Sequence, residues 1–198
     1  MLLSRPLKSM ALGIALIAGG CDRQSDDGAQ PRDAAAAAGA QSDAGGGEAL
    51  SGMLDRSQAG KEIPDVTLGD AAGNRLALRS LKGGPLLVNL WATWCAPCVV
   101  ELPMLDRIAR AMDGKLKVLT VSQDMTDTGK VAPFLTGRKL DRLEPWLDPK
   151  SDLTAALGAQ TLPTTILFDE EGREIWRYVG GNDWTSEQSR KLLDEGTN

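Results

Sequence analysis

Two cysteines separated by two residues are the most reactive feature of this sequence. Cys95 and Cys98 lie in the stretch NLWATWCAPCVVELP, residues 89–103, directly after an apolar run. Such a pair can be a redox dithiol, half of a metal site or a structural disulfide. The composition and the elements around the pair discriminate among these three kinds of site.

The composition argues against a metal site and against a structural disulfide. A structural zinc ion normally takes four Cys or His ligands, but the sequence has no histidine, and Cys95 and Cys98 are the only cysteines after Cys21. A disulfide across so short a loop restricts the unfolded chain very little and therefore adds little stability. The absence of histidine also excludes nucleophiles that an imidazole activates. A redox dithiol is the favoured interpretation.

The elements predicted around the pair suit a redox dithiol. The run PLLVNLW before it is typical of a buried central strand, and apolar residues after it recur at helical spacing until Gly114. The unpaired N–H groups at the helix N-terminus favour the Cys95 thiolate, and Pro97 tolerates the first turn because its missing N–H would be unused there. We therefore expect Cys95 to be the exposed, reactive thiol and Cys98 to be shielded.

The rest of the C-terminal region predicts alternating strands and helices. We expect a hairpin around AAGN, strands at KLKVLTVSQ and LEPWLD, two strands joined at EEG, and helices at residues 130–140, SDLTAALG and TSEQSRKLLDEG. Ser151 or Asp152 is expected to cap the second of these helices, and Thr185 with Gln188 resembles a capping box for the third. This order predicts an α/β fold with a mixed central sheet flanked by helices.

Residues 1–21 have the composition of a lipoprotein-type signal peptide. Arg5 and Lys8 precede an apolar run that is too short to span a bilayer, and small residues precede Cys21. We expect Cys21 to be lipidated, although Ala18 replaces the large aliphatic residue that is usual three positions before such a cysteine. The alternative is a secreted protein in which Cys21 is a free thiol.

Residues 22–60 are rich in Ala, Gly, Asp, Ser and Gln and poor in large apolar side chains. This composition cannot bury a core, so we expect a disordered tether. A coil of roughly 40 residues has a reach on the order of 35 Å, enough to lift a domain clear of a membrane. The chain is therefore divided into a signal peptide over 1–21, a tether over 22–60 and a domain over 61–198.

The sequence resembles proteins of the thioredoxin fold at two separate motifs. WATWCAPC follows an apolar strand, and TLPTTILFD lies further along the chain. Within that fold, the CxPCxxELP pattern and the tether resemble the TlpA/ResA group of membrane-anchored thiol-disulfide oxidoreductases, which includes the cytochrome c maturation reductases. The resemblance covers roughly residues 61–195. It implies a thioredoxin-like fold with an N-terminal β-hairpin extension.

The resemblance implies roles for the residues of the first motif. Cys95 matches the nucleophile of the group, and Cys98 matches the thiol that resolves the mixed disulfide. Trp94 and Pro97 are expected beside the substrate. Glu101 matches the buried glutamate of the group, and we expect it to assist proton transfer at Cys98; the alternative is a solvated helix carboxylate.

The second motif supplies the other half of the expected substrate site. Pro163 matches the cis-proline that lies opposite the cysteines, and an ordinary trans proline is the alternative. The backbone of Leu162 is expected to pair with an extended client segment, which is a local form of strand addition. Asn89 stands where thioredoxin has a buried aspartate, and an amide cannot shuttle a proton.

The resemblance implies an extracytoplasmic enzyme, anchored to the outer face of the cytoplasmic membrane, that reduces disulfides in client proteins. Cytochrome c maturation and copper-site assembly are candidate pathways. The implied partners are client proteins and a membrane thiol electron donor of the CcdA or DsbD type, and no cofactor is implied. Export places the dithiol where disulfides persist, so it needs such a donor to stay reduced.

Other functions remain as alternatives. A thiol oxidase or isomerase would use the same dithiol in another direction. A peroxidase is disfavoured because Ala92 stands where peroxiredoxins have threonine, and a copper-binding chaperone is disfavoured by the lack of histidine. No basic stripe follows a phosphate backbone, and the net charge is −5, so nucleic acid is not an expected partner.

Overall fold

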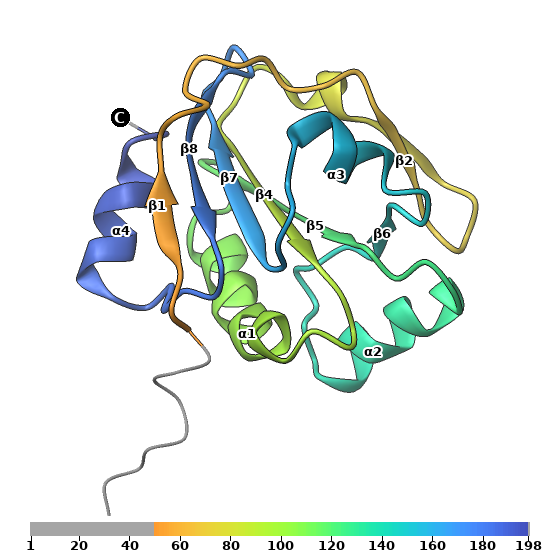
Figure 1. Cartoon of the computed structure of the whole chain (residues 1–198). Helices are drawn as coiled ribbons and strands as arrows, with labels where there is room; N and C mark the ends of the chain where they lie inside the picture. Colours follow the sequence, from red (N-terminus) through yellow and green to blue (C-terminus); the bar gives the residue numbers. More distant parts are fainter. Residues whose placement is uncertain (1–49, 198) are drawn as a thin grey trace, which may run out of the picture. The chain divides into compact units, whose positions relative to one another are not determined.

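Strand β4 (Leu86–Trp91) is buried at every position, as its apolar run predicts. The computed structural model describes residues 50–197 and places β4 within an eight-stranded sheet of order β1-β8-β7-β4-β5-β6-β2-β3 (Figure 1). β4 runs parallel to β5 (Lys117–Ser122) and antiparallel to β7 (Thr164–Phe168). A strand that is paired on both sides and covered on both faces is apolar almost throughout.

The predicted hairpin around AAGN forms one end of the sheet. It consists of β2 (Thr67–Gly69) and β3 (Arg75–Ala77), and β2 joins the sheet through β6 (Trp146–Leu147). The Asp70 carboxylate fixes the turn by accepting hydrogen bonds from the backbone N–H groups of Ala72 and Asn74. The expected N-terminal hairpin extension is therefore confirmed.

Strand β1 (Met53–Asp55) forms the other edge, where it pairs with β8 (Glu174–Val179). The predicted start of the domain at residue 61 is therefore wrong, because residues 50–60 are part of the folded unit. A Cβ atom at Gly52 would lie 2.4 Å from the Tyr178 ring, so only glycine fits there. A short edge strand pairs through its backbone and needs few apolar side chains, which explains why composition missed it.

The predicted signal peptide over 1–21, the tether before residue 50 and the predicted lipidation site Cys21 lie outside the described residues. Within residues 50–197, no helix combines the length and the apolar character that crossing a membrane requires.

Helices cover both faces of the sheet (Figure 1). One face packs against α1, α2 and α4 through a cluster that includes Leu87, Leu102 and Leu192, and the other packs against α3 and η1 through a cluster that includes Val88 and Leu153. The helices have the following bounds: η1 (Leu78–Leu81), α1 (Ala96–Ala111), η2 (Thr128–Lys130), α2 (Val131–Gly137), α3 (Asp152–Leu157) and α4 (Glu187–Asp194).

Both predicted helix caps are wrong in detail. Ser151 precedes α3 in a left-handed conformation without a side-chain capping bond, and Asp148 instead accepts from the N–H groups of Leu153 and Thr154. Ser186 caps α4 by accepting from the Ser189 N–H at 3.1 Å. In each case the tertiary path of the loop brings a different oxygen to the unpaired N–H groups of the first turn.

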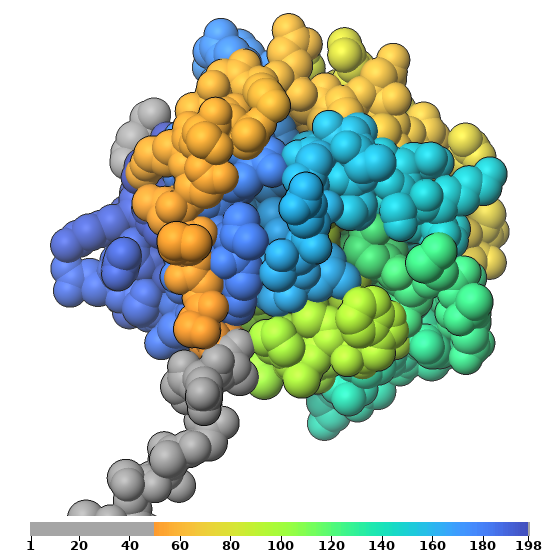
Figure 2. All heavy atoms as spheres, viewed as in Figure 1, coloured from red at the N-terminus to blue at the C-terminus, as the bar shows by residue number. Residues whose placement is uncertain are grey.

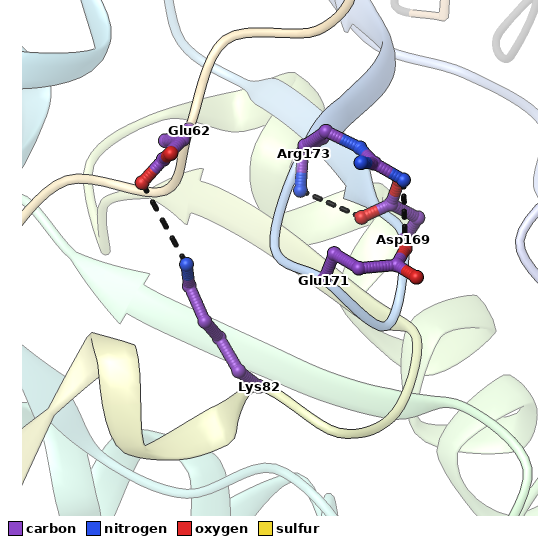
Figure 3. Close-up of polar contacts among 5 residues, drawn as sticks. All are labelled: Glu62, Lys82, Asp169, Glu171 and Arg173. Atoms are coloured by element: carbon purple, nitrogen blue, oxygen red, sulfur yellow. Dashed lines mark hydrogen bonds and ion pairs between the residues drawn. The ribbon is translucent and has the colours of Figure 1, made fainter.

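The turn between β7 and β8 carries exposed ion pairs (Figure 3). The Arg173 guanidinium donates to Asp169 at 3.0 Å and to Glu171 at 2.9 Å, and Lys82 lies 3.7 Å from Glu62 nearby. This turn follows the last residue of β7, whereas Pro163 precedes the first. The charged turn and the cysteine-bearing end of β4 therefore lie at opposite ends of the sheet.

Candidate functional site

The two cysteines lie where β4 gives way to α1 and are joined in a disulfide. Cys95 is the N-cap residue of α1, and its sulfur accepts a hydrogen bond from the Cys98 N–H at 3.4 Å. Cys95 is 5% exposed and Cys98 is 0% exposed, so both are buried in the disulfide-bonded protein, in contrast to the exposed Cys95 that was expected, and Cys95 is the more accessible of the two. Pro97 lies in the first turn of α1, where no N–H is needed. Figure 2 shows the yellow-green start of α1 at the surface.

The loop that leads into β7 lies beside this junction. The Leu162–Pro163 peptide bond is cis, as the resemblance implies. In the sheet register Thr164 pairs with Leu90, which places Pro163 beside the end of β4. The Pro163 carbonyl accepts a hydrogen bond from the Gly180 N–H at 2.8 Å, so this carbonyl already has a partner within the protein.

Glu101 is fully buried one helical turn after Cys98, so the solvated alternative is wrong. Its Oε1 accepts from Asn89 Nδ2 at 2.8 Å, and its Oε2 accepts from Trp184 Nε1 at 3.0 Å and the Asn182 N–H at 3.2 Å. Burial raises the pKa of Glu101 to about 7, and these three hydrogen bonds oppose that rise. A carboxyl group with this pKa can both accept and donate a proton near neutral pH.

Asn89 connects Glu101 to the sheet. Its Nδ2 group also donates to Thr165 Oγ1 at 2.9 Å, while its Oδ1 atom has no hydrogen-bond partner among the described residues. An unpaired buried amide oxygen costs on the order of 1–3 kcal/mol. The side-chain amide of Asn89 is therefore oriented so that its NH2 group donates to Glu101, and this orientation leaves its Oδ1 atom without a hydrogen bond among the described residues.

An exposed apolar surface borders the disulfide. Trp94, the residue before Cys95, is 68% exposed, and Met125 is 69% exposed. The loops that carry them are held together because Thr93 donates to the Asp124 carboxylate at 2.6 Å from its hydroxyl and at 3.0 Å from its N–H. Burial acts to raise the pKa of Asp124, but hydrogen bonds, including those from Thr93, lower it overall, so the carboxylate accepts the two Thr93 bonds in its charged form.

Sequence reasoning missed three of the residues at this site. Trp184 and Asn182 contact Glu101 from more than 80 positions along the chain, so no local spacing could identify them. Met125 follows the predicted strand KLKVLTVSQ within three residues, in a segment without helical or strand periodicity. A large apolar side chain in such a loop was the one available signal.

Known proteins similar to this chain carry out thiol-disulfide chemistry. A family model described as Redoxin matches residues 58–193. The thiol-disulfide oxidoreductase ResA of Bacillus thuringiensis (strain Al Hakam) is 29% identical over 141 residues, which cover 71% of this chain and 77% of that protein. The thiol:disulfide interchange protein DsbE of Pseudomonas fluorescens biotype C is 32% identical over 143 residues, covering 69% and 78%.

A solved structure shares the fold. The pneumococcal exposed lipoprotein thioredoxin Etrx1 from Streptococcus pneumoniae strain TIGR4 superposes with a TM-score of 0.59 at 25% identity and covers 67% of this chain and 99% of its own. The predicted thioredoxin-like fold, with a mixed sheet flanked by helices, is therefore confirmed. The chain belongs to the redoxin family and is a TlpA/ResA-like thiol-disulfide oxidoreductase.

Proposed function

We propose that this enzyme reduces disulfides in client proteins at the outer face of the cytoplasmic membrane, where Cys21 anchors it through a lipid. The observation that carries the proposal is the disulfide at the start of α1, with its outer sulfur on Cys95 and a buried carboxyl group, Glu101, one turn beyond Cys98. A proton acceptor one helical turn from the inner thiol suits the step in which that thiol must become a nucleophile.

The reaction begins with the reduced enzyme. The Cys95 thiolate attacks one sulfur of the client disulfide, forming a mixed disulfide and releasing the other client sulfur as a thiolate, which takes up a proton. Glu101 accepts the proton of Cys98, and the Cys98 thiolate attacks the Cys95 sulfur. This attack releases the second client sulfur as a thiolate, which takes up a proton, so the client leaves as a dithiol. The enzyme retains the disulfide, and two electrons have passed from enzyme to client.

The client binds across the surface around Cys95. Trp94 and Met125 offer apolar contact to side chains that flank the client cysteine, and the backbone at Leu162, before Pro163, pairs with an extended client segment. Pro97 lies in the first turn of α1 between the two cysteines and contributes to the same surface.

A membrane thiol electron donor of the CcdA or DsbD type then returns two electrons to the enzyme. The signal peptide and tether expected before residue 50 support this arrangement, because anchoring raises the effective concentration near a membrane donor. The structural neighbour Etrx1 is an exposed lipoprotein thioredoxin, which supports this arrangement further. Clients in cytochrome c maturation or copper-site assembly fit this location.

Trapping tests the proposal. A Cys98→Ser variant should accumulate mixed disulfides between Cys95 and its clients, since the resolving thiol is gone, and mass spectrometry of these adducts identifies the pathway. The matched control, Cys95→Ser, should trap none of them. In cells with an intact donor the wild-type protein should be mainly reduced. A protein that stays oxidised there is an oxidase, and the direction proposed here is then wrong.

A further inference from the structure

One short segment supplies both donors to the same carboxylate oxygen of Glu101. The Asn182 N–H and the Trp184 indole N–H both point at Oε2, at 3.2 and 3.0 Å. Residues 182–184 lie between β8 and α4, far from the cysteines in sequence. Converging N–H donors are the arrangement that stabilises negative charge on a buried oxygen.

The segment is held in place by contacts that do not involve Glu101. The Asn182 side chain donates to Ser189 Oγ at 3.0 Å, and that hydroxyl donates to the Asp183 carbonyl at 2.7 Å. The Trp184 ring stacks on Trp176, with ring centroids 6.3 Å apart, and meets Tyr178 edge to face at 5.9 Å. The two donors are therefore fixed before any change in charge on Glu101.

We propose that residues 182–184 form a carboxylate clamp that stabilises the ionised form of Glu101, and that the Trp184 indole N–H is its main side-chain contribution. Trp184 is thus a positioning residue that acts on Cys98 through Glu101. The consequence for catalysis depends on the proposed function, in which Glu101 accepts the Cys98 proton. The clamp itself does not depend on it.

The groups around Glu101 leave few other sources of charge stabilisation. Its hydrogen-bond donors from β4 and from the clamp are all uncharged. Asp183, within the clamp, accepts from the N–H and hydroxyl groups of Thr185, and Arg107 of α1 acts on that carboxylate. On the same helix Cys98 is held in the disulfide, and from β7 the neutral hydroxyl of Thr165 faces Asn89.

Removal of the indole N–H therefore has a defined expected effect. A hydrogen bond to a charged group changes an equilibrium about tenfold or more, which corresponds to about one pH unit. Without the bond the ionised carboxylate loses a donor, so the protonation midpoint of Glu101 should move upward. Desolvation would still act in full, because a phenylalanine at position 184 keeps the site covered.

The test is a carboxyl ¹³C NMR titration of Glu101 in the disulfide-bonded protein. Trp184→Phe should raise the midpoint by about one pH unit. The matched control is Trp146→Phe, which also removes an indole N–H that donates to a carboxylate. Trp146 lies on β6, packs against the cluster on the other face of the sheet and donates to Glu144 at 3.1 Å, so its loss should leave the Glu101 midpoint unchanged.

An unshifted midpoint in Trp184→Phe, or an equal shift in Trp146→Phe, would overturn the clamp. A measurement on the wild-type protein covers the case in which Trp184→Phe does not fold: the Trp184 indole N–H resonance should titrate with Glu101, while that of Trp176 should not. A Trp184 resonance that stays constant through the Glu101 midpoint also overturns the proposal. The titration uses oxidised protein without client, so failure of the reductase proposal would not affect it.

Discussion

Strand β7 has carboxylates near each of its ends, and the two groups are built in opposite ways. At its start Thr165 contacts Asn89, which holds the fully buried Glu101 together with other uncharged donors. After its last residue Asp169 and Glu171 lie in an exposed turn and pair with Arg173 (Figure 3). Glu101 has no cation among its hydrogen-bond donors, whereas Asp169 and Glu171 share the guanidinium of Arg173.

This difference separates a proton-exchanging site from a merely charged one. Burial without a cation raises the pKa of Glu101 to about 7, where its charge changes near neutral pH. In the turn, the hydrogen bond from Arg173 to Asp169 raises the pKa of the guanidinium, which stays charged. Exposed ion pairs of that kind contribute little to stability.

The largest expected effect comes from removing the sulfur of Cys95, beside the start of β7. Cys95→Ala should reduce disulfide exchange by at least about 1,000-fold, because the attacking group is lost. Cys98→Ala should keep the first attack, visible as a mixed disulfide with a model disulfide peptide in single-turnover measurements. Equal loss of that first step in both variants would contradict the assignment of Cys95 as nucleophile.

Stability against pH provides the second contrast. The folded pKa of Glu101 is about 7 and its ordinary value is 4.5, so folding favours the protonated form. The stability that this preference contributes is fully present below pH 4.5 and is lost as the pH rises through 7. Between pH 4.5 and 7 the free energy of unfolding of the wild type should therefore fall by about 3 kcal/mol relative to that of Glu101→Gln, which has no carboxyl group at this position.

Urea unfolding at a series of pH values measures this difference. Glu171→Gln is the matched control at the exposed end, and it should keep the wild-type dependence on pH. Parallel curves for the wild type and Glu101→Gln between pH 4.5 and 7 would show that Glu101 titrates normally in the folded protein.

A smaller effect is expected for the exposed side chain of Met125, on the loop that follows β5. Met125→Ser should lower kcat/KM about threefold to tenfold for a disulfide peptide with apolar residues beside its cysteine. The variant loses the apolar contact that the Met125 side chain makes with the bound peptide. Oxidised glutathione, which has no such flanking residues, should react unchanged. Met53→Ser on β1 is the control, because Met53 is 73% exposed on a strand four positions from β5 in the sheet. Equal losses in both variants would remove Met125 from the client surface.

The smallest effect is expected at the charged turn. Arg173→Ala should leave exchange rates unchanged and shift Tm by no more than about 2 °C, because exposed ion pairs are screened by solvent. Thermal unfolding and peptide reduction assays measure both quantities. A substantial loss of exchange would mean that the two ends of β7 are coupled.

Sequence reasoning was most successful where the periodicity of apolar residues determines structure. The run at β4, the helical spacing of α1 and the hairpin at AAGN each follow from local pattern, and all three are present. The position of Glu101 on α1 also follows from its distance to Cys98, whereas its full burial followed only from the family resemblance. These features depend on residues that are close together in the chain.

The remaining features depend on contacts between distant segments. Trp184 reaches Glu101 only because β8 ends beside α1, and no pattern around residue 184 indicates that contact. Asp148 caps α3 in place of the predicted Ser151 because the loop turns back on itself. β1 pairs through its backbone, so its side chains carry no signal of a strand.

The proposed reduction requires Glu101 to accept a proton near neutral pH, and the pH profile of kcat/KM for client-peptide reduction measures this role. The wild type should show an inflection near pH 7. Glu101→Gln should lose that inflection and react about 10- to 100-fold more slowly above it, while the exposed control Glu171→Gln should keep the wild-type profile. An unchanged inflection in Glu101→Gln would show that Glu101 is not the proton acceptor.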